Sequence, residues 1–174
     1  MKLTGYFIKK KIQALIQEAS QRECRSVSLA EARSLLILYN AEDHQAVMKL
    51  LQPLRKEKKE INTCVYLSEK SAELQATGST VLVHAKGDLN AWCFPSDKIV
   101  EEVKKMKADI LIDLTRPSCY ALQYIALQHP SKFKVGIKYP EQNWYDLALS
   151  ITDKDEIEYL FQQILFYLRS MGSK

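Results

Sequence analysis

The chain has 174 residues, of which 47% are hydrophobic and 26% charged, a composition typical of one globular domain and unlike that of a disordered or fibrous protein. Its formal net charge of +4 is uneven, because residues 1–60 carry +5 and the remainder −1. No apolar run reaches the ~20 residues of a membrane span, and Lys9, Lys10 and Lys11 interrupt the N-terminal apolar stretch before a secretory signal forms. We therefore expect no membrane span and a cytoplasmic location.

The potential metal ligands are scattered. No C-x-x-C pair occurs, and the three histidines are as dispersed as the four cysteines, Cys24, Cys64, Cys93 and Cys119. Such spacing indicates free thiols in a reducing compartment, most of them buried. We expect no metal site and no cofactor, since zinc ligands would have to be gathered by the fold alone.

The N-terminal segment, residues 1–22, predicts an amphipathic helix over 3–21. Its apolar residues recur at helical spacing on one stripe, formed by Ile8, Ile12, Leu15, Ile16 and Ala19. Because this helix precedes the first predicted strand, it packs either on the sheet or against a partner.

The next stretch predicts a β-α-β unit. Residues 34–39 form a continuous apolar run, typical of a strand covered on both faces of a parallel sheet. Asn40 is placed to cap the following helix, in which Pro53 is expected to kink or end the regular part. A second strand is expected over 61–67, joined by a right-handed crossover.

A third strand is expected over 80–84, followed by a segment that the sequence does not define. Residues 86–95 fit either a hairpin or a loop held by Trp92 and Phe94. Ser96 is expected to cap a helix that turns four residues inward, Ile99, Val100, Val103 and Met106.

The last part of the chain alternates again. A buried strand is expected over 109–114, then a helix that starts near Pro117 and ends by His129, because Pro130 follows. Two short strands, 133–138 and 146–151, precede a final helix over about 153–171. That helix carries extra apolar surface off its main stripe, which indicates a second neighbour or an interface: Tyr159, Phe166 and Tyr167.

This alternation predicts an α/β fold: a three-layer sandwich with a mostly parallel, Rossmann-like sheet, helices on both faces and an extra N-terminal amphipathic helix. We expect a single domain over 1–174, with its sheet-and-helix core in 34–171. In such sheets ligands bind beyond the carboxyl ends of the strands.

Two of these strand ends offer little evidence for a site. One argues against nucleotide binding, and the other carries only weak candidates for catalysis. The turn after the first strand has no glycines and carries Glu42 and Asp43, which excludes a phosphate-binding loop there. His84, Lys86 and Asp88 follow another strand and are capable of acid–base work, but a polar loop around a glycine explains them as well.

The strongest candidate site is the strand end at 113–119. Arg116, the hydroxyls of Thr115 and Ser118 and the free amides of a helix start would together hold a phosphate or carboxylate, with Asp113 nearby. Cys119, at the same helix start, would have a lowered pKa. The structural alternative is that Thr115 or Ser118 caps the helix, Arg116 pairs with a surface carboxylate and Cys119 packs in the core.

Three segments together resemble an uncharacterised bacterial family, a domain of unknown function of similar length: residues 109–114, 133–137 and 144–149, followed by an aromatic-rich final helix. A looser resemblance is to the N-terminal half of heptosyltransferase-like glycosyltransferases, through the D-x-x-I-D-L strand and a strand ending near K/R-x-G. The glycine-rich loop of those enzymes is replaced here by residues 40–43. This second resemblance implies a shared fold whose sugar-transfer chemistry has been lost.

These patterns favour a non-catalytic module that acts through protein contacts, as a homodimer or with another protein, through its N- or C-terminal helix. The first alternative is a binder of a small phosphorylated metabolite or carboxylate at 113–119, which includes a degenerate glycosyltransferase-like enzyme. The second is a weak nucleic-acid binder through the basic N-terminal region, which is disfavoured because its lysine clusters lack interleaved aromatic residues and any nucleic-acid-binding motif.

Overall fold

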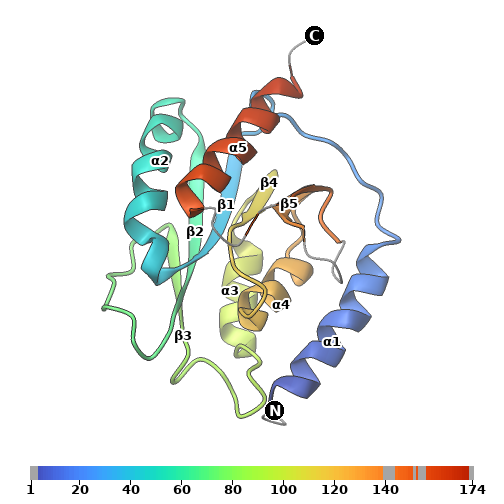
Figure 1. The fold of residues 1–174 in the computed structure, drawn as a ribbon, viewed down its shortest axis with the longest axis vertical. Helices are drawn as coiled ribbons and strands as arrows, with labels where there is room; N and C mark the ends of the chain where they lie inside the picture. The colour runs from blue at the N-terminus through green and yellow to red at the C-terminus, as the bar shows by residue number, and fades with distance from the viewer. Residues whose placement is uncertain (1–3, 139–143, 151, 153–155, 173–174) are drawn as a thin grey trace.

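The computed structural model describes residues 4–138, 144–150, 152 and 156–172, and these form an α/β sandwich (Figure 1). The described strands form one fully parallel sheet in the order β3-β2-β1-β4-β5-β6. Their bounds are β1 (Ser34–Asn40), β2 (Glu60–Leu67), β3 (Thr80–His84), β4 (Ile110–Asp113), β5 (Phe133–Ile137) and β6 (Leu147–Leu149).

Helices cover both faces of this sheet, which confirms the predicted three-layer architecture (Figure 1). One face packs against α2 (His44–Lys56) and α5 (Ile157–Ser170). The other packs against α3 (Asp97–Lys105) and α4 (Tyr120–Gln128), with α1 (Thr4–Ala19) lying on α4. A short 3-10 helix, η1 (Ala41–Asp43), joins β1 to α2.

The central strand β1 shows why an unbroken apolar run is needed. Leu35, Ile37 and Tyr39 point into the core under α2 and α5, whereas Leu36 and Leu38 point into the core under α3 and α4. All five side chains are fully buried, because alternate residues of a strand face opposite sides and both sides are covered.

Helix α1 belongs to the molecule's own core. Ile8 and Ile12 are buried in the same cluster as residues of α4, and the segment after α1 is held by an ion pair of 2.6 Å between Arg22 and Asp146. Helix α1 therefore packs within the molecule, on α4 in the layer that covers this face of the sheet, and its opposite face is exposed.

Three local expectations need correction. Helix α2 runs past Pro53 to Lys56, so the proline does not end it; Pro53 stands in the last turn at an exposed position. Asn40 does stand at the N-cap position of η1, but its side chain makes no cap hydrogen bond. Strand β6 covers only Leu147–Leu149 within the predicted 146–151, and residues 153–155 of the predicted last helix lie outside the described residues.

Segment 86–95, which the sequence does not define, is a turn-rich loop rather than a regular hairpin, closed by a single antiparallel bridge between Leu89 and Pro95. None of the described helices is long and apolar enough to cross a membrane.

Candidate functional site at the carboxyl edge of the sheet

The strand order reverses between β1 and β4, and the carboxyl ends of these two neighbours meet at the edge where such folds bind ligands. The turn after β1 contributes Asn40, Glu42 and Asp43, and the turn after β4 contributes residues 113–119. The predicted site residues therefore do lie at the switch point of the sheet.

Asp113 is completely buried at the end of β4, where both of its carboxylate oxygens accept hydrogen bonds from within the protein. Its carboxylate accepts hydrogen bonds from the N–H of Thr115 at 2.9 Å, the hydroxyl of Thr115 at 2.5 Å and the hydroxyl of Tyr145 at 2.7 Å. Burial raises the pKa of Asp113, although these hydrogen bonds oppose the shift. Asp113 and Thr115 thus form an internal polar link between β4 and the segment before β6, closed to a ligand from solvent.

Of the remaining candidates, Arg116 and Ser118 are exposed and Cys119 is buried. The charge of Arg116 acts on Asp43, whose pKa burial raises and Arg116 lowers. The predicted residues therefore divide into an inner group, Asp113, Thr115 and Cys119, and an outer pair that faces water.

The predicted reactive thiol is not found. Cys119 occupies the N-cap position of α4, yet burial raises its pKa to about 12, the opposite of the expected lowering. A small cavity of about 90 Å³ lies beside it, lined also by Ser118, Tyr66 and Cys93. The structural alternative holds for this residue, because Cys119 packs in the core; it also takes the N-cap position of α4 that was expected for Thr115 or Ser118.

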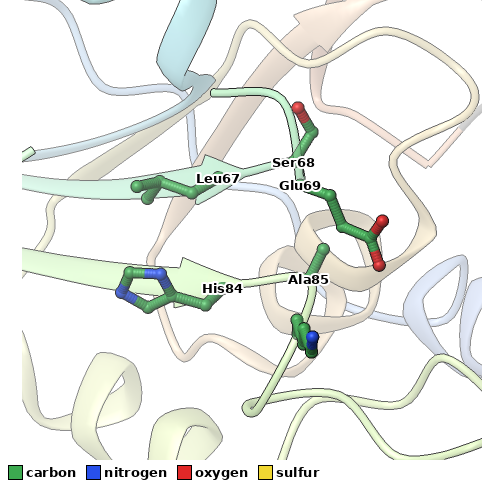
Figure 2. A pocket seen from close by; sticks show the side chains of 6 residues that line it. Leu67, Ser68, Glu69, His84 and Ala85 are labelled. Carbon is green, nitrogen blue, oxygen red and sulfur yellow. The ribbon is translucent and has the colours of Figure 1, made fainter. Parts of the chain in front are cut away.

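A second, open pocket of about 360 Å³ lies where β2 and β3 end (Figure 2). Figure 2 shows the imidazole of His84 and the carboxylate of Glu69 pointing away from one another, which does not suit a paired acid and base. The carboxylate of Asp88 accepts a hydrogen bond from the N–H of His84 at 2.8 Å, so its visible role is to shape the loop.

Sequence reasoning missed an apolar groove on the described surface. Phe7 and Lys11 of α1, Trp92 and Phe94 of the 86–95 loop and Tyr124 of α4 line a groove of about 480 Å³, which we call the α1 groove. The available signal was Phe7, an aromatic residue placed off the buried stripe of its helix, but its partners come from sequence positions that only the fold brings together.

No metal centre is indicated within the described ranges, where no three histidine, cysteine, aspartate or glutamate side chains gather in a group suited to an ion.

The strand order 3-2-1-4-5-6 with helices on both faces defines a Rossmann-like α/β protein whose switch point lacks a glycine-rich turn. A family model matches residues 5–171, nearly the whole chain. The protein belongs to this family, DUF6913, a family of unknown function.

No functionally curated protein matches the sequence. Among solved structures, an exopolyphosphatase-related protein from Bacteroides fragilis superposes with a TM-score of 0.53 at 16% identity. The match covers 92% of this chain and 44% of that one, so this chain spans less than half the length of that protein. Identity this low shows a shared fold alone. The resemblance to heptosyltransferase-like enzymes stays a prediction.

Proposed function

We propose that the protein is a cytoplasmic, non-catalytic α/β module that acts through protein–protein contacts. One observation carries this proposal: a set of large apolar side chains on α5 points into solvent although the helix already has a complete buried face. The exposed set, which we call the outer face of α5, consists of Tyr159, Phe166, Tyr167 and Met171, each more than 40% exposed.

The geometry of α5 separates the two faces. Tyr159 and Phe166 are seven residues apart, or about two helical turns, and so lie on one line along the helix. The core-facing side chains lie on the opposite side: Ile157, Leu160, Phe161, Ile164, Leu165 and Leu168. A helix that is apolar on both sides calls for a second neighbour.

A second copy of the chain is the partner that this face fits best. The residues that neighbour the exposed aromatics on this face, Gln163 and Ser170, carry no charge. Nearby charges are paired away from them, Glu158 with Lys49 and Arg169 with Glu57, both of which lie on the α2 side. Two such faces meet around a two-fold axis without opposing like charges.

The test is sedimentation of the full chain over a range of concentrations. We expect a dimer that Phe166→Glu converts to a monomer, because the variant places a carboxylate in the centre of the contact. The matched control is Gln17→Glu, which adds the same charge at an exposed position of α1, on the opposite face of the sheet, and should leave the dimer intact. A wild-type chain that stays monomeric at every concentration contradicts the homodimer.

A specific observation also favours a second candidate function, binding of a phosphorylated ligand at the switch point. The exposed Arg116 stands just before α4, and a cation beside a helix N-terminus is a combination that attracts phosphate groups. The similarity to an exopolyphosphatase-related protein makes a short polyphosphate the natural probe.

This second candidate is tested by thermal unfolding with tripolyphosphate. Stabilisation of the wild-type chain that disappears in Arg116→Ala and persists in Arg25→Ala, an exposed arginine outside the carboxyl edge, supports it. Equal stabilisation of all three proteins, or none, removes it.

A further inference from the structure

The α1 groove is built from side chains that hold one another in place. The rings of Phe7 and Trp92 pack edge to face with their centres 4.6 Å apart, and those of Phe94 and Tyr124 do so at 5.3 Å. Aromatic pairs of this geometry stabilise each other beyond simple burial. The walls of the groove are thus formed before any partner arrives, and its 480 Å³ lies within the range of small-ligand and side-chain pockets.

Trp92 is held outward by its own turn. The side-chain oxygen of Asn90 accepts hydrogen bonds from the N–H groups of Trp92 at 2.9 Å and Phe94 at 3.1 Å. Cys93 between them has a φ of +66°, a left-handed conformation that the turn imposes. The indole nevertheless remains 46% exposed, so a well-bonded turn presents a large apolar ring to solvent.

The edge of the α1 groove is positively charged. Lys9, Lys10 and Lys11 are exposed on α1; Lys11 lines the groove itself, and the ammonium of Lys9 lies 5.0 Å from the ring centre of Tyr120. None of the three forms an ion pair with any residue that the structure describes. An apolar cavity beside unpaired cations is complementary to a segment that combines an apolar side chain with carboxylates.

We propose that the α1 groove binds an acidic peptide segment of a partner protein, which inserts one bulky apolar side chain between the rings and places its carboxylates on the lysines. This inference rests on the proposed function as a protein-contact module but uses a surface separate from the outer face of α5. Helices α1 and α5 lie on opposite faces of the sheet, so both surfaces are accessible in one molecule (Figure 1).

Single-stranded nucleic acid is the rival occupant, because it also combines rings and negative charge. The groove favours the peptide. Its rings are paired edge to face around a concave space, whereas base stacking needs open, flat ring faces.

The experiment titrates the full chain with a short synthetic peptide in which a central phenylalanine and leucine are flanked by glutamates. Trp92 fluorescence reports binding, since the chain's other tryptophan, Trp144, is buried. We expect saturable binding that weakens at least about tenfold in Trp92→Ala and in Lys11→Glu. Because Trp92→Ala lacks the reporter, both variants are compared with the wild type by the anisotropy of a labelled peptide.

Two matched controls separate this surface from the rest of the molecule. Lys56→Glu makes the same charge change on α2, and Tyr159→Ala removes an exposed aromatic from α5; both should bind as the wild type does. The titration is repeated with Phe166→Glu, which lacks the proposed dimer contact. Peptide binding by the α1 groove is thereby tested whether or not the dimer forms.

The proposal is overturned if the peptide does not bind, if replacing its glutamates by glutamines leaves the affinity unchanged, or if Trp92→Ala binds normally. Tighter binding of an oligothymidylate that depends on the same two residues also overturns it and assigns the groove to nucleic acid.

Discussion

Tyr145 packs its ring against the backbone of Gly136 in β5 while its hydroxyl donates to the buried carboxylate of Asp113. A Cβ at position 136 would overlap the ring of Tyr145. The glycine in the strand therefore has a packing role, and the reason for it is a side chain nine residues further along the chain. The sequence does not predict this role of Gly136, because residue spacing alone does not show which aromatic ring approaches a strand.

We expect Gly136→Ala to lower the free energy of unfolding by about 1–3 kcal/mol, because the added methyl group forces the ring of Tyr145 away from β5 and from Asp113. Urea denaturation measures the change. Gly78→Ala is the matched control, since a Cβ there meets no atom within 4 Å, and it should leave stability unchanged or slightly higher. Equal stability of the two variants would contradict this account of Gly136.

At the scale of elements, helix starts show how far local sequence rules reach. Ser96 was expected to cap α3, and its side chain does accept a hydrogen bond from the N–H of Ile99. Ser118 was an equally reasonable cap for α4, yet that helix begins one residue later, with Cys119 in the N-cap position and no side-chain cap. Both serines have the right residue type, and only the path of the chain decides which one faces the free amides.

The two serines make a direct comparison. We expect Ser96→Ala to cost about 1 kcal/mol of stability, through loss of the cap to Ile99, and Ser118→Ala to stay within about 0.5 kcal/mol. Thermal unfolding of both variants tests this difference. A larger loss in Ser118→Ala would mean that its hydroxyl supports α4 after all.

Across the whole molecule, a polar network at the amino edge of the sheet ties distant segments together. The carboxylate of Asp146 accepts hydrogen bonds from the guanidinium of Arg22 and from the backbone N–H of Lys134. The buried ammonium of Lys134 donates a hydrogen bond to the carbonyl of Leu127 at 3.1 Å. Burial, assisted by the charge of Arg22, lowers the pKa of Lys134 to about 8. The network joins the segment after α1 to α4 and β5, so its protonation affects the stability of the entire fold.

The pH dependence follows from this shift. Lysine in the unfolded chain titrates near 10.5 and Lys134 in the folded chain near 8, so between these values the unfolded state binds more protons. Stability contributed by Lys134 therefore rises from pH 8 to pH 10.5, by about 3 kcal/mol in total, and is lost again as the pH falls from 10.5 to 8. Guanidinium unfolding at several pH values should show this rise in the difference between the wild type and Lys134→Met.

Taking the difference between two proteins removes the other buried groups that titrate at alkaline pH, such as Tyr39, whose pKa burial raises to about 12. The control Lys98→Met changes an exposed lysine on α3 and should keep the wild-type pH profile. A difference curve that stays flat between pH 8 and pH 10.5 would show that the ammonium of Lys134 is not desolvated as the structure indicates.

The sequence by itself determined the layers of this protein. Continuous apolar runs such as residues 34–39 occur in strands covered on both faces, and alternation of these runs with helical stripes leaves an α/β sandwich as the fold. The tertiary structure alone decided what the strand ends and surfaces hold. It buried Asp113 and Thr115 in mutual hydrogen bonds, raised the pKa of Cys119 by removing it from water, and assembled the α1 groove from three separate segments. Periodicity reports which side of an element is apolar, whereas burial of a polar group and convergence of distant side chains depend on how the elements pack.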